Sequence, residues 1–474
     1  MSKNQSQSQS QRDFYCRNSN ILHNNAGLAP AMARYVQIHP ELRSIPLENW
    51  DVSKVTDMSG WFESMDGDLL PDLSCWDTSN VKNMAYMFAD YHGKLPNIGK
   101  WNTSRVENMH AIFEGSKIRN FDIGDWDTSS VKDMSNAFRW CGYIRIIRLD
   151  KWNTSNVTNM RGIFEGCTLL ETIGCEKWDV KKVQDFCSAF SSCQALKELD
   201  LSKWDMRSAQ DLSFMFRYAQ RLTTIDLGAN KCEAARDMTA MFKSCHWLEH
   251  LKLKLTTNLV HSFQSLFEGC YCLQTVDLST FNTRNLQDIS KMFKNCESLK
   301  YVNLSHFKTG KVINMEAAFE DCRELLFADT SNWNTSKVEL FNDMFRGCIN
   351  LIKVDVSSFD TRNADDLNGM FADCHRLASV DVSSFDTRRV ANFSGMFTDC
   401  KALVSLDLSN FIISDGAETF RMCNNCMSLL TLKPPVKKAT VIVGYTAVDD
   451  CSSLIYADRA KFEDIIEDED DFWN

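Results

Sequence analysis

Hydrophobic positions along the chain recur with a fixed period. The Phe that closes the segment "WDTSNVKNMAYMF" at 76–88 returns again and again at a nearly constant spacing. The column comprises Phe62, Phe88, Phe113, Phe138, Phe164, Phe190, Phe216, Phe242, Phe267, Phe293, Phe319, Phe345, Phe371 and Phe397. Two degenerate copies, with Cys423 and Val448 in the Phe position, give 16 units between about Trp50 and Leu454. Such a period predicts an architecture built from stacked repeats.

Each unit contains two hydrophobic patterns, seen most clearly in "FNTRNLQDISKMFKNCESLKYVNLSH" at 281–306. The first half spaces apolar residues three and four apart, which predicts one face of a short helix. These residues are Leu286, Ile289, Met292, Phe293 and Cys296. The second half has the spacing L-x-x-L-x-L, which predicts a short strand. These residues are Leu299, Val302 and Leu304.

Polar residues between the two patterns predict how the elements are joined. Thr78 and Ser79 come shortly after Trp76, where they are expected to cap the helix by accepting a hydrogen bond from a backbone N–H. Asp77 precedes them and suits the turn that leaves the strand, because a short carboxylate can bond its own backbone.

One unit by itself is too short to bury its own apolar stripe, whereas stacked units share one continuous core. The predicted fold is therefore an α/β solenoid of leucine-rich-repeat type. We expect about 16 coils, each of roughly 25–26 residues with a short helix and a short parallel strand.

The repeated pattern W/F-D/N-T-S-x-V-x-x-M-x-x-M-F-x-x-C-x-x-L-x-x-L-D-L-S resembles the BspA-like leucine-rich repeat family of bacterial surface proteins and of protist and other microbial proteins. The resemblance covers about 400 of the 474 residues. It implies a leucine-rich-repeat solenoid, and it implies adhesion or protein binding as the function. Many members carry a signal sequence and an anchor, neither of which is visible here.

The ends of the chain depart from the repeat and predict four segments. Residues 1–19 are expected to form a disordered Ser/Gln-rich tail, and 20–48 an N-terminal cap that covers the first coil. The solenoid is expected over 49–456. Residues 457–474 form an acidic tail, for which a solvated charge run and a peptide that docks on a basic groove are both open.

Composition narrows the classes of partner. The net charge of -11 argues against nucleic acid, and the chain lacks an apolar run of about 18 residues, which predicts no membrane insertion. A protein partner with a basic surface fits this charge. The oligomeric state is left open.

Nineteen cysteines would suggest disulfides, but twelve of them share one inward position of the repeat. They are Cys141, Cys167, Cys193, Cys245, Cys270, Cys296, Cys322, Cys348, Cys374, Cys400, Cys426 and Cys451. There Cys behaves as a small hydrophobic residue, so we expect a column of reduced thiols and a cytoplasmic location; the cell surface or a virion is the alternative. The single C-x-x-C of Cys423 and Cys426 lacks a second pair, so no metal site is predicted.

A column of carboxylates is the one candidate binding feature. It occupies the outward position between the last two inward residues of each strand, and aligned carboxylates repel one another. The candidate strip consists of Asp200, Asp226, Asp277, Asn303, Asp329, Asp355, Asp381 and Asp407. Each Asp could simply accept hydrogen bonds from nearby hydroxyls such as Ser202, Ser279 or Ser357 and keep the face soluble. Alternatively, the strip could bind a basic partner segment or cations.

No motif for phosphate binding, metal-assisted hydrolysis or nucleophilic catalysis occurs, so no catalytic residue, cofactor or enzymatic activity is predicted. The favoured function is a non-catalytic protein-binding solenoid of adhesion or scaffold type that presents its sheet face and acidic strip. The alternative is a structural component that packs against itself in a surface layer, virion or other assembly.

Overall fold

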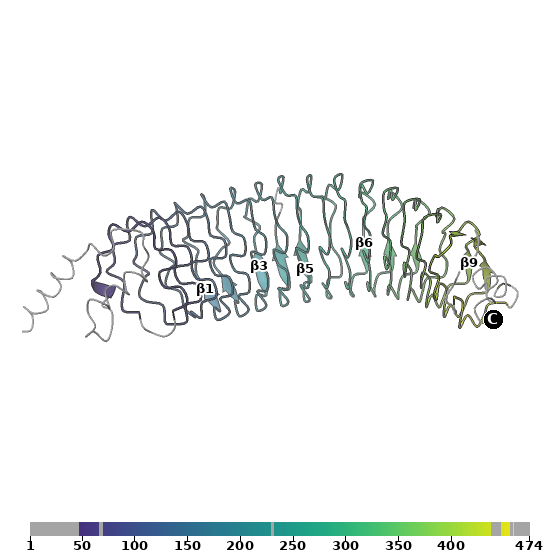
Figure 1. Cartoon of the computed structure of the whole chain (residues 1–474), viewed down its shortest axis with the longest axis horizontal. Coiled ribbons are helices and arrows are strands. Elements are labelled where there is room, and N and C mark those ends of the chain that lie inside the picture. The colour runs from purple at the N-terminus through teal and green to yellow at the C-terminus, as the bar shows by residue number, and fades with distance from the viewer. Residues whose placement is uncertain (1–46, 66–69, 229–231, 438–446, 456–457, 459–474) are drawn as a thin grey trace, which may run out of the picture. The chain divides into compact units, whose positions relative to one another are not determined.

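The computed structural model describes residues 47–65, 70–228, 232–437, 447–455 and 458. The predicted tail at 1–19 lies outside these residues, as do the cap at 20–48 and the acidic tail at 457–474 except for 47, 48 and 458. The chain divides into two units. Unit 1 runs to Asp211 and includes 218–220, and unit 2 consists of Leu212–Arg217 and the chain from Arg221 onward. In each unit successive coils repeat the same path (Figure 1).

Short strands occupy the L-x-x-L-x-L segments, except for β10 (Ile412–Ile413) and β12 (Val436–Lys437), which follow these segments in their coils. A 3-10 helix, η2 (Leu47–Asn49), precedes them. The strands of unit 1 are β1 (Ile146–Ile147), β2 (Thr172–Ile173) and β3 (Glu198–Asp200). Unit 2 contains β4 (Thr224–Asp226), β5 (His250–Lys252), β6 (Tyr301–Val302), β7 (Phe327–Ala328), β8 (Lys353–Val354), β9 (Ser405–Asp407), β10 (Ile412–Ile413), β11 (Thr431–Lys433) and β12 (Val436–Lys437).

All strand pairs within a unit are parallel, as predicted. Strand β1 pairs with β2 in unit 1; in unit 2, β4 pairs with β5, β7 lies between β6 and β8, β9 pairs with β11, and β10 pairs with β12. The strands define about eleven turns of a parallel β-solenoid, so the predicted sixteen coils are not supported. Before Ile146, the described coils have no regular strand and meet at single bridges, such as Asp57 with Asn83.

The predicted helix in each coil is wrong. Among the described residues of 50–455 there is no α-helix. Overlapping turns take its place, as between Met134 and Cys141, where the N–H groups of residues 137, 139 and 141 donate to the carbonyls three residues earlier at 3.2, 3.0 and 3.1 Å. The first and last of these turns have positive φ at their third residue, 57° at Asn136 and 59° at Trp140, which defines type II turns.

The N–H groups between these turns bond to the next coil. Phe138 N donates to Ile163 O at 2.9 Å, and Asn136 N donates to Arg161 O at 2.7 Å. Alternate N–H groups therefore close a turn in their own coil or join the following coil. Apolar residues spaced three and four apart fit these overlapping turns as well as they fit a helix. The periodicity alone therefore could not distinguish the two structures.

The inward side chains form columns of like residues. The Phe column stacks, with 5.4 Å between the ring centroids of Phe138 and Phe164 in unit 1 and 5.3 Å between those of Phe319 and Phe345 in unit 2. Aromatic pairs in this offset arrangement stabilise a core beyond their burial. The core thus runs along each unit, as the period predicted.

Two predictions about the turn residues have different outcomes. Asp77 accepts a hydrogen bond from Ser79 N at 3.1 Å, so its turn role is confirmed. Thr78 does not cap a helix. It is fully buried, and its Oγ1 donates to Asn102 O of the next coil at 3.0 Å.

The cysteine column is buried, and its thiols bond to the backbone. Cys141 Sγ donates to Phe113 O at 2.9 Å, and Cys322 Sγ donates to Phe293 O at 3.1 Å. Each thiol thus satisfies a carbonyl of the preceding coil. Burial raises the pKa of the Cys141 thiol to about 12, so this thiol is protonated at neutral pH.

Candidate functional site

The residues of the predicted acidic strip occupy equivalent places on the coils. Asp200 belongs to unit 1 and the other seven belong to unit 2. Each is exposed or half-buried, at the end of a strand or at the corresponding position of a coil without one. The column therefore faces outward, and its role in binding stays a prediction.

The strip residues accept hydrogen bonds from the turn that follows. Asp200 Oδ1 accepts Ser202 N at 2.9 Å, and Asp277 Oδ1 accepts Ser279 N at 3.0 Å. At Asp355 both the N–H and the hydroxyl of the serine two residues later donate, at 3.1 and 2.6 Å. These bonds are the ones that the solubility interpretation of the strip requires.

Asn303 shows whether the turn needs a charged side chain or only a side-chain oxygen. Its side-chain oxygen accepts the N–H and the hydroxyl of Ser305 at 3.1 and 2.8 Å, which matches the bonds at Asp355. An uncharged amide therefore serves the turn as well. Since seven of the eight strip residues are nevertheless Asp, the turn alone does not account for the carboxylates.

A second column of residues in unit 2 includes side chains that accept the same kind of turn hydrogen bond, and it can be compared with the strip. There Ser290 N donates to Asp288 Oδ1 at 2.7 Å and Glu316 N donates to Asn314 Oδ1 at 2.9 Å. The position is chemically mixed, in contrast to the strip. Its residues are Asp237, Ser262, Asp288, Asn314, Leu340, Asp366, Asn392 and Glu418.

Four of the strip carboxylates have a lowered pKa: Asp277, Asp355, Asp381 and Asp407. The hydrogen bond from Ser357 holds the pKa of Asp355 below its usual range. Lys433 of the next coil lies 2.6 Å from Asp407 Oδ2 and, with Ser409, lowers the pKa of Asp407 to about 2. Hydrogen bonds from serines lower the pKa of Asp277 and Asp381 in the same way, so these four carboxylates carry their charge at neutral pH.

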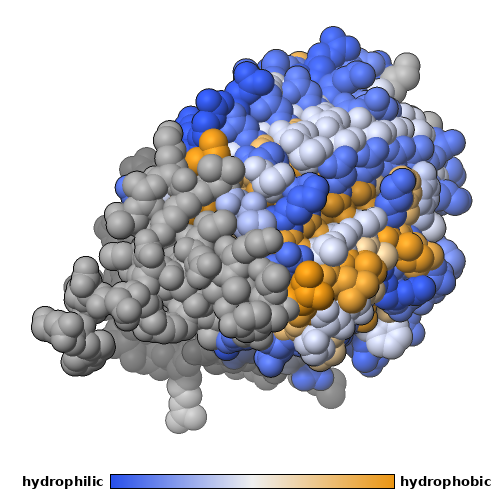
Figure 2. Space-filling model, turned by 90° about the vertical axis from the view of Figure 1, so that its right-hand side faces the viewer, coloured by the Kyte–Doolittle hydropathy of each residue, from blue (hydrophilic) through white to orange (hydrophobic). Residues whose placement is uncertain are grey.

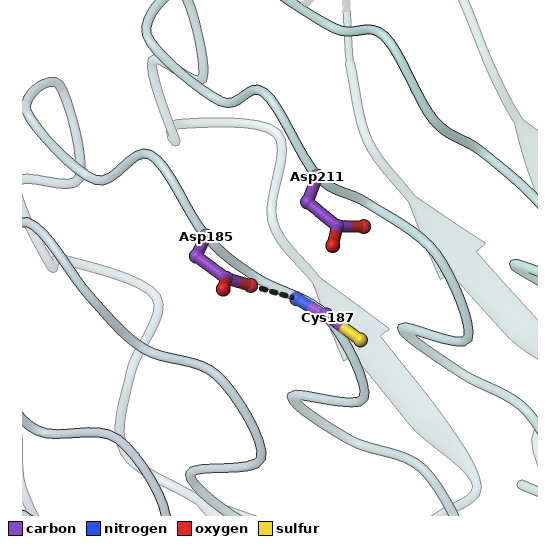
Figure 3. Close-up of side chains that lie close together, drawn as sticks. All are labelled: Asp185, Cys187 and Asp211. Atoms are coloured by element: carbon purple, nitrogen blue, oxygen red, sulfur yellow. Dashed lines mark hydrogen bonds between the residues drawn. The ribbon is translucent and has the colours of Figure 1, made fainter.

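Two groups of side chains have metal-ligating atoms close together. Asp185, Cys187 and Asp211 form one group in unit 1, in which Asp185 Oδ1 accepts Cys187 N at 2.8 Å (Figure 3). Arg161 Nη1 lies 3.4 Å from Asp185 Oδ2 and 3.8 Å from Asp211 Oδ2. The turn bond and this guanidinium account for the group without a cation.

The second group, Asp373, His375 and Asp399, lies in unit 2. Arg346 Nε is 3.9 Å from Asp373 Oδ2, and Lys401 Nζ is 3.5 Å from Asp399 Oδ1. These basic side chains already balance the carboxylates.

Exposed aliphatic side chains that were not predicted from the sequence lie beside the strip. They occupy the first residue after the inward Leu that begins the L-x-x-L-x-L segment. We call Leu326, Ile352, Ala378, Val404 and Leu430 the apolar row. All five are exposed, and seen from the C-terminal side hydrophobic residues gather in an exposed band (Figure 2). Aligning the repeats by column would have found the row, because preceding coils carry Glu249, Gln274 and Lys300 at this position.

None of the helices among the described residues is long and apolar enough to cross a bilayer. No curated protein matches the sequence. Solved structures to which this chain is similar include a leucine-rich repeat protein from Bacteroides ovatus, at 18% identity, a TM-score of 0.31, and coverage of 70% of this chain and 85% of that chain. A leucine-rich cell surface protein from Faecalibacterium prausnitzii has 13% identity, a TM-score of 0.26, and coverage of 81% and 84%. An internalin from Listeria monocytogenes has 13% identity, a TM-score of 0.24, and coverage of 92% and 96%.

The family model described as "Mycoplasma protein of unknown function, DUF285" matches residues 31–145, 132–254, 223–328 and 313–431. These matches cover well over half of the chain, and its repeats are of the BspA-like leucine-rich type. The chain belongs to the DUF285 family.

Proposed function

We propose that this protein is a non-catalytic binding solenoid that presents the strand face of its coils, with the acidic strip, to a basic surface of a protein partner. The observation that carries the proposal is the excess of Asp over Asn in the strip, because Asn303 makes the same turn bonds without a charge. Repulsion between neighbouring carboxylates costs stability, so a charge that the turn does not need points to a role outside folding.

The two lysines beside the strip indicate how a partner would bind. Lys252 Nζ lies 2.8 Å from Asp226 Oδ2, and Lys433 Nζ lies 2.6 Å from Asp407 Oδ2. In both pairs the serine or glycine of the turn bonds to Oδ1. A lysine or arginine of a partner would use the Oδ2 atoms of Asp329, Asp355 and Asp381 in the same way.

The test is partner capture with a crosslinker from the native source, followed by mass spectrometry. The Asp329→Asn, Asp355→Asn, Asp381→Asn triple variant should capture at least tenfold less partner while it keeps its melting temperature within about 3 °C. A matched control, Asp237→Asn, Asp288→Asn, Asp366→Asn, removes three charges from the mixed column and should capture normally. Equal capture by both triple variants and the unchanged protein would leave the strip with only its solubility role.

Self-packing in an assembly is the competing function. It predicts that the purified protein associates with itself as its concentration rises, which sedimentation velocity measures. The cytoplasmic location stays a prediction.

A further inference from the structure

The apolar row and the acidic strip run side by side on unit 2. Leu326, Ile352, Val404 and Leu430 are 43%, 48%, 44% and 51% exposed. Backbone bonds join their coils directly, since Ile352 N donates to Leu326 O at 3.3 Å and Leu430 N donates to Val404 O at 2.9 Å. Exposed aliphatic side chains in a continuous line mark an interaction surface.

Strand pairing does not require these apolar side chains. Lys300 N donates to Gln274 O at 3.2 Å, and Leu326 N donates to Lys300 O at 3.2 Å, so polar residues at the same position make the same bonds. The corresponding position in unit 1 is polar as well, where Arg145 and Glu171 form an ion pair at 2.5 Å. The change from polar to aliphatic residues is therefore confined to part of unit 2. The backbone hydrogen bonds between the coils do not change with it.

The acidic strip adds charge next to the row. Asp329, Asp355 and Asp381 lie three residues after Leu326, Ile352 and Ala378 along the same coils, a path of about 10 Å in extended chain. Among the described residues, the serine bonds to Asp329 and Asp355 end on Oδ1. Their Oδ2 atoms can thus accept a cation, as those of Asp226 and Asp407 do.

The spacing between neighbouring coils indicates which secondary structure a bound partner segment would have. Neighbouring strands lie about 4.8 Å apart, and the stacked Phe rings of these coils are 5.3 to 5.9 Å apart. The pitch of an α-helix is about 5.4 Å, which is longer than the distance between strands and lies within the range of the distances between Phe rings. Side chains on one face of an extended strand recur after about 6.6 Å and would lose register within two coils.

Resting on the proposed function, we propose that the row and the strip together bind an amphipathic, basic α-helix of a partner protein, laid along the coils. One aliphatic residue per helical turn contacts one residue of the apolar row. Lysines or arginines on the adjacent helix flank pair with Asp329, Asp355 and Asp381. Five coils match four to five turns of helix, which corresponds to about 14 to 18 residues.

The experiment uses the full chain and a synthetic 18-residue helical peptide with leucines at positions 1, 4, 8, 11 and 15 and lysines on one flank, measured by fluorescence anisotropy. We expect saturable binding that weakens at higher salt. A peptide of the same composition with leucines at every second position, and one with glutamates in place of the lysines, should each bind at least tenfold more weakly.

Variants of the chain locate the contact. Ile352→Gln with Val404→Gln should raise the dissociation constant at least tenfold, as should Asp329→Asn, Asp355→Asn, Asp381→Asn, which should also flatten the salt dependence. Gln274→Ala with Lys300→Gln alters the same repeat position outside the row and should change binding less than twofold. All these side chains are on the surface, so an unchanged melting temperature is expected for each variant.

Several results would overturn the helical occupant: equal binding of the alternating peptide, no binding of any peptide, binding indifferent to the row variants, or a dimer of this chain that Ile352→Gln dissociates. If no peptide binds while partner capture remains dependent on the strip, the helix is wrong and the proposed function stands. If capture is also indifferent to the strip, both are wrong.

Discussion

The Phe column allows a quantitative test of the repeat register. Phe319 is 1% exposed, and its ring lies 5.6 Å from that of Phe293 and 5.3 Å from that of Phe345. Replacing Phe319 with Ala removes a fully buried ring and both stacking contacts. Truncation of a buried Phe costs about 3 to 5 kcal/mol, and part of this cost is the loss of stacking, about 1 kcal/mol per pair.

Because each coil contacts mainly its neighbours, the loss should be local at first. Hydrogen exchange measured by mass spectrometry should show reduced protection in the coils around residues 293–345, with protection around residue 138 unchanged. Urea unfolding should show a midpoint lowered in proportion to the lost free energy. Phe420→Ala is the matched control, since Phe420 is 48% exposed and its truncation should cost less than about 1 kcal/mol.

The result that would refute this reasoning is equal destabilisation by the two variants, or a loss of protection spread evenly over the chain. Either outcome would mean that the ring column does not hold neighbouring coils together. An unchanged urea midpoint for Phe319→Ala would contradict the assigned register itself.

Three further predictions follow from the turns, the thiols and the strip. Ser192 has a φ of 60°, so Ser192→Gly should raise the free energy of unfolding by about 0.5 to 1 kcal/mol, whereas Ser208→Gly, at ordinary φ, should lower it by a similar amount, both measured by urea unfolding. Iodoacetamide at pH 8 should alkylate the exposed Cys75 in the folded protein and leave Cys141 intact; mass spectrometry of tryptic peptides checks this, and rapid labelling of Cys141 would contradict its burial. The pKa of Asp407, about 2, lies below its value of about 3.9 in an unfolded chain, so its contribution to stability is present above pH 4 and is lost as the pH falls toward 2. Asp407→Asn should therefore be less stable than the unchanged protein at pH 6 and equally stable near pH 2 in thermal unfolding.

The sequence predicted what depends on burial. The Phe column, the parallel strands and the outward place of Asp355 follow from which positions are apolar, and each was located correctly. The turn role of Asp77 followed from the chemistry of its short side chain. These features need no knowledge of the backbone angles.

The prediction of a helix in each coil was wrong because the spacing of hydrophobic residues carries no information on the sign of φ. Positions two residues before and after the column Phe have positive φ, at Asn136 and Trp140 for example. Gly, Asn and Asp are frequent there, as in Gly162 and Gly166, and this enrichment was a signal that the sequence did contain. The direction of the Thr78 bond to the next coil had no such signal, since it depends on how two coils are offset.

The apolar row was missed for a different reason. A single Leu, Ile or Val on a surface carries little information, and Leu326 or Val404 only becomes notable when every coil is aligned. Reading the repeat down its columns as well as along its length distinguishes residues that the fold needs from residues that vary for another purpose.

Backbone hydrogen bonds that alternate within and between coils limit which insertions and deletions in the gene preserve the fold. Phe138 N donates to Ile163 O in the following repeat, and Phe293 N donates to the equivalent acceptor, Ala318 O, in its own following repeat. Unequal crossing-over that inserts or deletes one whole repeat therefore leaves each donor opposite the same kind of acceptor, whereas an insertion of any other length displaces all of them. Relatives of different lengths should accordingly differ by whole repeats, with the flanking coils unchanged.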